Sequence, residues 1–188
     1  ASDVYKRQVM VASLGRLLAS NGKRVLLIDC DWRCPRLHQT FRCSNRVGLA
    51  SVLGEKDMVL TDAIHHDSLS GVDVMPAGNW NPRQSHLISS DRMRHLLAAL
   101  EPDYDFILLD TPPVLVAAEV LALSRLVNKV IFVLRWGHTR REAVMEALKQ
   151  IIEAQGDVAG VVLSRVVAKQ YSQYAYGTAM HEYARPAM

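Results

Sequence analysis

Two apolar runs that each end in an aspartate, RVLLID at residues 24–29 and FILLD at residues 106–110, decide the fold of this chain. Their apolar residues follow one another without alternation, which is typical of strands that helices cover on both faces of a parallel sheet. Ligands of such sheets bind beyond the carboxyl ends of the strands. We therefore expect Asp29 and Asp110 to mark the edge of the sheet that carries the chemistry.

Helix-like and strand-like segments alternate around these two runs. The expected helices are one that ends near residue 20, just before Gly22, and others at 35–41, 49–53, 91–100, 117–126 and 139–154, and the further strands are at 72–75, 130–134 and 158–163. Asp91 and Thr139 are the expected N-caps of two of these helices. Strands that alternate with helices predict an α/β fold, a mostly parallel sheet with helices on both faces.

The composition is that of a globular chain. The 188 residues are 49% hydrophobic and 22% charged, which excludes a disordered, fibrous or low-complexity protein. A net charge of +3 is too small to indicate a nucleic-acid partner, and we expect none. An odd count of three cysteines fits reduced thiols in a reducing compartment better than a secreted disulfide protein. The apolar runs at 114–118 and 130–134 fall far short of the roughly 20 residues of a membrane helix.

The chain divides into three parts. The run DVYKRQ at residues 3–8 resembles the translated end of a transposon-type sequencing adapter, so residues 1–8 are interpreted as a scar and the natural sequence is expected to begin near Val9. Recovery of the same eight residues from an independent clone would refute this. Residues 9–168 are expected to form a single domain, and residues 169–188 a tyrosine-rich tail.

The acidic strand ends predict a divalent-cation site. If the two strands are neighbours, their ends lie about 4.8 Å apart, and Asp29 and Asp110 would then share one hydrated Mg²⁺. Asp31 lies two residues further on and would reach the same site, while Arg33 offers a planar donor fork to a phosphate or a carboxylate. Each aspartate taken alone is more often a turn former or a helix cap than a metal ligand, so that interpretation stays open.

Several motifs then resemble one family in its own order. VLLIDCDWR at 25–33, followed by PRLHQTF, resembles the second Walker-like motif of the bacterial tyrosine kinases (BY-kinases), and FILLDTPPVL at 106–115 resembles their Walker B motif. VMPAG, DRMRHLLAAL, VLRWGHTRREAV and GVVLSRVV resemble later landmarks, so the resemblance extends from about residue 14 to 176. Single motifs of this set also occur in the wider group of deviant P-loop ATPases.

The resemblance implies a P-loop-type, doubly wound fold and autophosphorylation on tyrosine with ATP and Mg²⁺. By motif, Asp29 would contribute to Mg²⁺ binding near the attacking hydroxyl, and Asp110 would hold the metal through its water shell. Asp31 would position or deprotonate the acceptor tyrosine. Ser164 occupies the place where many related ATPases have an asparagine that reads the adenine base, so the selectivity for the base stays open.

The resemblance also implies a cellular setting. Members of the family act in the synthesis and export of extracellular polysaccharide, at the inner face of the cell membrane. They are fused to, or bind, a membrane chain-length regulator, also called a polysaccharide co-polymerase. A homo-oligomer is expected for the full-length protein.

The largest departure from the family pattern is the missing Walker A loop. A glycine-rich loop that ends in Gly-Lys-Ser/Thr should precede the first helix, because its backbone N–H groups and lysine hold the phosphates. That place falls on residues 1–9, which contain no glycine, so Lys6 and Arg7 are assigned no phosphate-binding role. We therefore expect this chain to bind ATP weakly and to be an inactive or weak kinase fragment.

Four of the six tyrosines lie in the last 18 residues: Tyr171, Tyr174, Tyr176 and Tyr183. Their setting is polar and has neither helical nor strand periodicity. The cluster resembles the phosphoacceptor tail of the family, whereas the alternative is an aromatic patch that packs on a neighbour.

Two other functions stay open. One is an ATP-driven dimerisation switch of the chromosome-partitioning (ParA) or septum-placement (MinD) type, whose members lack the terminal tyrosine cluster. The other is a non-catalytic docking module for the membrane polysaccharide regulator, which would need no phosphate loop.

Overall fold

Strand β1 (Val25–Asp29) lies inside a four-stranded sheet, and all five of its residues are buried. The computed structural model describes residues 4–55 and 58–167, so the tail tyrosines at 171–183 lie outside the described residues. The strand order is β2-β3-β1-β4. Strands β3 (Val72–Met75) and β4 (Phe106–Asp110) run parallel to β1, and the short edge strand β2 (His65–Asp67) is antiparallel to β3.

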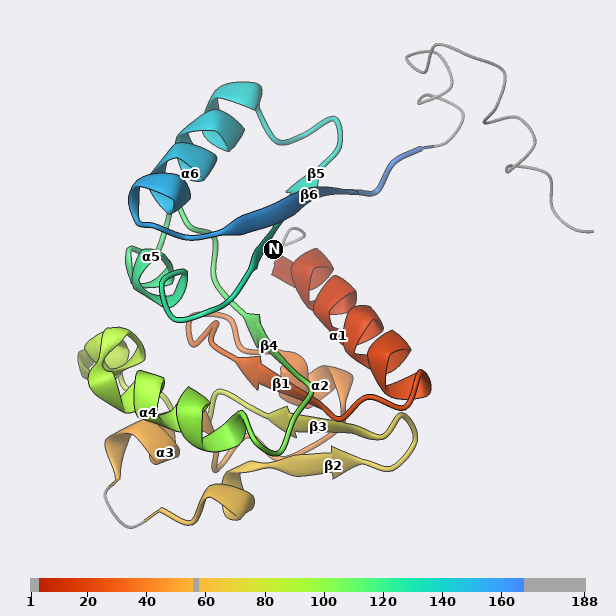
Figure 1. The fold of residues 1–188 in the computed structure, drawn as a ribbon, viewed down its shortest axis with the longest axis vertical. Coiled ribbons are helices and arrows are strands. Elements are labelled where there is room, and N and C mark those ends of the chain that lie inside the picture. Colours follow the sequence, from red (N-terminus) through yellow and green to blue (C-terminus); the bar gives the residue numbers. More distant parts are fainter. Residues whose placement is uncertain (1–3, 56–57, 168–188) are drawn as a thin grey trace, which may run out of the picture.

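The last two strands form a separate parallel pair. Strand β5 (Val130–Arg135) pairs with β6 (Val158–Ser164), and the register shifts between Val130 and Ile131. The predicted α/β fold with a mostly parallel sheet is thus confirmed. The hydrogen-bonded ladders of the described residues nevertheless divide into two sheets, of four and two strands. Figure 1 shows β5 and β6 apart from the strands around β1.

Helices and short 3-10 turns connect the strands. Their bounds are α1 Val4–Ser20, α2 Leu37–Thr40, α3 Leu49–Gly54, η1 Leu60–Ala63, η2 Pro82–Ser89, α4 Asp91–Leu100, α5 Glu119–Leu123 and α6 Arg141–Glu153. Helix α1 ends where expected, because Gly22 adopts a left-handed φ of 76° just beyond it. Among the described helices, none is long and apolar enough to cross a lipid bilayer.

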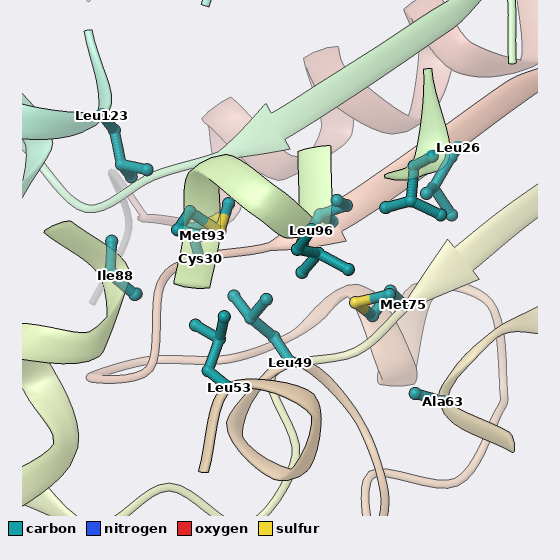
Figure 2. Close-up of a cluster of buried hydrophobic side chains, with 12 residues drawn as sticks. Leu26, Cys30, Leu49, Leu53, Ala63, Met75, Ile88, Met93, Leu96 and Leu123 are labelled. Carbon is teal, nitrogen blue, oxygen red and sulfur yellow. The ribbon is translucent and has the colours of Figure 1, made fainter. Parts of the chain in front are cut away.

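The side chains of β1 alternate between two apolar layers. Leu26 and Ile28 belong to a buried cluster formed with α3, α4 and η2, part of which Figure 2 shows. Val25 and Leu27 point to the other face, where Val11 and Leu18 of α1 pack against their cluster. Helices therefore cover both faces of this sheet, which holds the carboxyl end of β1 in a fixed position.

A close backbone contact fixes α3 against the end of β3. The amide of Leu49 donates a hydrogen bond to the carbonyl of Pro76 at 2.8 Å. A Cβ atom on Gly48 would lie 2.1 Å from that carbonyl oxygen, so only glycine fits between the two segments.

The two expected N-caps are wrong by one residue. Helix α4 is capped by Ser90, whose hydroxyl accepts the amide of Arg92 at 3.2 Å, and Asp91 is the first helical residue. Helix α6 begins after Arg140 without a side-chain cap, because the hydroxyl of Thr139 accepts the amide of Arg135 instead.

Candidate active site

Asp29 and Asp110 lie opposite each other at the carboxyl ends of β1 and β4. The register of the parallel ladder pairs Asp29 with Asp110, and the strands of such a ladder are about 4.8 Å apart. Asp29 is fully buried and Asp110 is only 2% exposed. Two carboxylates are thus held side by side, largely shielded from water.

Asp29 organises the loop that follows its own strand. Its Oδ1 accepts the amide of Asp31 at 3.1 Å, and its Oδ2 accepts the amides of Arg36 and Leu37, each at 3.0 Å. The carboxylate therefore holds both the turn after β1 and the start of α2. Each oxygen of a carboxylate accepts more than one bond, so Oδ1 keeps room for a further donor.

Asp31 lies beside the same rim and pairs with helix α1. One of its oxygens accepts the amide of Cys34 at 3.1 Å, and the other lies 3.2 Å from a guanidinium nitrogen of Arg7. Asp31 is 2% exposed, so this ion pair is largely shielded from solvent.

Asp110 carries a buried oxygen, Oδ2, that has no hydrogen-bond partner among the described residues. Two further polar atoms in this part of the chain, Oε1 of Gln8 and Nε of Arg7, are also buried and without a partner. Gln8 is 1% exposed, and its amide nitrogen donates to the carbonyl of Cys34 at 3.3 Å. Unpaired buried polar atoms are costly, so this rim suits a polar or charged ligand.

Burial is the main cause of a raised pKa in both carboxylates of the pair. Burial raises the pKa of Asp110 to about 8, the charge of Asp29 adds to this rise, and Arg7 opposes it. Burial likewise raises the pKa of Asp29 to about 6, against the lowering effect of the three amides that it accepts. A cation at the rim would favour the ionised form of both groups.

These residues fit a hydrated Mg²⁺. Carboxylate oxygens are hard ligands, and Mg²⁺ in proteins commonly takes one or two of them and keeps several waters. The unpartnered Oδ2 of Asp110 suits such a water. No group of three or more His, Cys, Asp or Glu side chains in the described part of the chain is arranged to hold a metal ion.

The other two candidate residues lie further from the pair. Arg33 is 3.7 Å from a carboxylate oxygen of Glu119 and about half exposed, so its guanidinium forms an ion pair with a carboxylate. Ser164 ends β6, and its hydroxyl donates to the carbonyl of Leu134 at 2.9 Å. Ser164, Thr111 and Arg7 line one cavity of about 320 Å³ beside the rim.

An aromatic pair lies next to Asp31 in the sequence. Trp32 stacks on Trp80 with 5.2 Å between the ring centroids and 30° between their planes. Both rings pack against the same buried cluster as Leu26 and Ile28.

The sequence analysis did not predict that Arg7 contacts Asp31 or that Gln8 contacts the carbonyl of Cys34. Both lie in the stretch interpreted as a scar, and neither has a neighbouring glycine that would indicate a phosphate loop. The only available signal was their position at the amino end of a helix that leads into β1.

Comparison with known proteins identifies the family. A protein-family profile described as "AAA domain" matches residues 6–159. The tyrosine-protein kinase YwqD of Bacillus subtilis is 30% identical over 170 residues, which are 90% of this chain and 71% of YwqD. This chain belongs to the bacterial tyrosine kinases.

Other BY-kinases agree. The putative tyrosine-protein kinase EpsB of Ralstonia solanacearum is 33% identical over 172 residues, 92% of this chain. The solved kinase domain of the Escherichia coli tyrosine kinase ETK superposes with a TM-score of 0.77 at 30% identity, covering 89% of this chain and 66% of that one. The chain spans only 23% of the length of EpsB, so it corresponds to the kinase domain of such a relative.

Proposed function

We propose that this chain is the cytoplasmic kinase part of an ATP-dependent protein-tyrosine autokinase that acts in the production and export of extracellular polysaccharide. The observation that carries the proposal is the position of Asp29 opposite Asp110, with Asp31 beside them. Its relatives are named tyrosine-protein kinases, which supports the same chemistry in this chain.

Each aspartate has a proposed role. Asp29 would contribute to Mg²⁺ binding near the attacking hydroxyl, and Asp110 would hold the ion through its water shell. Mg²⁺ when bound would neutralise charge on the phosphate oxygens of ATP. Asp31 orients the acceptor hydroxyl and takes its proton. The phenolic oxygen bonds to the γ-phosphorus while the bond from that phosphorus to the β,γ-bridging oxygen breaks, and ADP leaves with the electron pair. Before it can accept the tyrosine hydroxyl, Asp31 must give up its ion pair with Arg7.

The proposed acceptors are the tail tyrosines Tyr171, Tyr174, Tyr176 and Tyr183. Tyr104 makes an instructive contrast, because its hydroxyl donates to Asp73 at 2.9 Å. Burial and the neighbouring carboxylate raise the pKa of Tyr104 well above its ordinary value, and its hydroxyl is held at Asp73, not at Asp31. Each phosphate on the tail would add about −1.5 to −2 charges and weaken a homo-oligomer by repulsion.

The phosphate cradle is the part that this chain lacks. Residues 1–9 contain no glycine. The proposed nucleotide contacts are already engaged, since Arg33 forms an ion pair with Glu119 and Ser164 donates to the carbonyl of Leu134. We therefore propose that the 188-residue chain binds ATP weakly and is at most a weak kinase. The parent protein would join a membrane chain-length regulator at the inner face of the cell membrane.

Autophosphorylation of the full-length parent with radiolabelled ATP tests the proposal. We expect label on the parent, a loss of most of it when the four tail tyrosines become phenylalanine, and at least a hundredfold loss of rate in Asp110→Asn. Asp157→Asn is the matched control, since Asp157 is 59% exposed and distant in the fold, on the loop before β6.

Two results would favour the other functions. An unlabelled parent that still hydrolyses ATP points to a dimerisation switch, and a parent that neither hydrolyses ATP nor becomes labelled points to a docking module. Label confined to Tyr104 would contradict the assignment of the tail.

A further inference from the structure

The turn that carries Asp31 has few backbone contacts of its own. The amide of Asp31 donates to Asp29 and the amide of Cys34 donates to a carboxylate oxygen of Asp31, each at 3.1 Å. Between them, the amides of Trp32 and Arg33 have no hydrogen-bond partner among the described residues. The position of the turn across the rim therefore depends on the side chains of Trp32 and Arg33.

Of these two side chains, Trp32 makes the better protected contact. Its ring stacks on Trp80 with 5.2 Å between the ring centroids, and both rings pack against the buried cluster that contains Leu26. Arg33 instead lies 3.7 Å from Glu119 and is 46% exposed, and ion pairs in contact with solvent contribute little to stability. The stack is thus the stronger of the two side-chain contacts that hold the turn.

Trp80 lies on a loop that the segment 45–50 holds in place. This loop follows β3, whose carboxyl end lies beside that of β1 because the two strands are parallel neighbours. Asn45 bonds to the amide and to the carbonyl of Gly78, at 3.0 and 3.4 Å. The amide of Ala50 in α3 also donates to the carbonyl of Ala77 at 2.9 Å. Trp80 is therefore a fixed surface on which the turn after β1 rests.

The ring of Trp80, not its N–H group, makes this contact. Its indole nitrogen Nε1 is buried and has no hydrogen-bond partner within the described residues. Stacking of aromatic rings does not need the N–H group, so phenylalanine at this position keeps a stacked ring, whereas alanine removes it. The chain thus offers a conservative variant and a disruptive one at the same place.

We propose that Trp80 is a positioning residue, which acts through Trp32 to hold Asp31 where it accepts the tyrosine hydroxyl. This inference rests on the role proposed for Asp31. Once Asp31 gives up its ion pair with Arg7, the stack is the main side-chain contact that holds the turn. A displacement of about 1 Å at a reacting group costs about a hundredfold in rate, so a contact outside the site affects the reaction.

Autophosphorylation of the full-length parent tests the proposal. Trp80→Ala should lower kcat at least tenfold and leave the KM for ATP within twofold, because Asp29 and Asp110 end strands of one ladder and do not depend on the stack. Trp80→Phe should restore most of the rate. The matched control is Leu97→Ala, since Leu97 packs on the same cluster but lines a cavity with Phe106, at the amino end of β4. Its kcat should stay within twofold.

Hydrogen exchange on the intact 188-residue chain tests the same contact without ATP. In Trp80→Ala the amide of Cys34, which Asp31 holds, should exchange at least tenfold faster, whereas the amide of Leu27 in β1 should not change. Unchanged exchange at Cys34 would overturn the inference. So would an unchanged kcat in a parent that takes up label, or a lowered kcat that Trp80→Phe fails to restore. A parent without label contradicts the proposed function instead, and the exchange at Cys34 then decides whether the stack holds the turn.

Discussion

The two sheets of this molecule differ in how completely they are enclosed. The sheet around β1 has helices on both faces, and five consecutive strand residues are buried. In the β5–β6 pair, Ile131, Val161 and Leu163 are each close to half exposed. Most of the burial therefore lies around the strand that carries Asp29, and a site that relies on fixed carboxylates gains most from that enclosure.

The largest effect on stability should come from shortening a leucine to alanine in each sheet. Leu26→Ala removes a fully buried side chain and should lower the free energy of unfolding by about 3 kcal/mol, whereas Leu163→Ala, at 45% exposure, should cost less than about 1 kcal/mol. Chemical denaturation measures both. Equal losses would remove the contrast between the sheets.

A second pair of variants compares two glycines. Gly48→Ala should cost more than about 2 kcal/mol, because the added carbon would lie 2.1 Å from the carbonyl of Pro76. Gly160→Ala in β6 meets nothing within 4 Å and should be close to neutral. Thermal unfolding of both proteins gives the difference, and a neutral Gly48→Ala would show that α3 is free to shift.

The pH dependence of stability sharpens the comparison at the rim. Because the pKa of Asp110 is raised to about 8 in the folded state, ionisation opposes folding as pH rises from about 4 to 8. Without divalent cations, Asp110→Asn should raise the free energy of unfolding by more than about 1 kcal/mol at pH 9 and by little at pH 4. Added Mg²⁺ should stabilise the original protein more than the variant.

The control is Asp157→Asn, which changes an exposed carboxylate. An equal pH profile of stability in the original protein and in both variants would show that burial of the Asp110 carboxylate does not oppose folding.

The smallest effects concern helix caps. Ser90→Ala removes the cap of α4 and should cost about 1 kcal/mol. Arg140→Ser supplies a cap that α6 lacks and removes a positive charge from the helix amino end, so it should gain about 0.5 kcal/mol. Denaturation midpoints report both, and a loss in the second variant would mean that Arg140 has another role.

The strands that carry the site could be predicted because their signals are local. Apolar runs that end in Asp29 and Asp110 indicate parallel strands whatever surrounds them. That the two strands are neighbours was only a condition of the predicted cation site, and the structure supplies it. The expected burial holds for β1 but not for β4, where Phe106 is 41% exposed. The division of the strands into two hydrogen-bonded sheets could not be predicted in this way, since the sequence pattern of a strand does not specify which strands lie beside it. The contact between Arg7 and Asp31 depends on the angle of α1 to the sheet, which no sequence pattern specifies.

The stacked tryptophans beside the rim have a practical consequence. Trp32 is next to Asp31 in the chain and shares its ring contact with Trp80, so any movement of the loop after β1 alters the surroundings of two indoles at once. Their emission therefore gives a label-free optical signal for titrating magnesium or nucleotide into this protein.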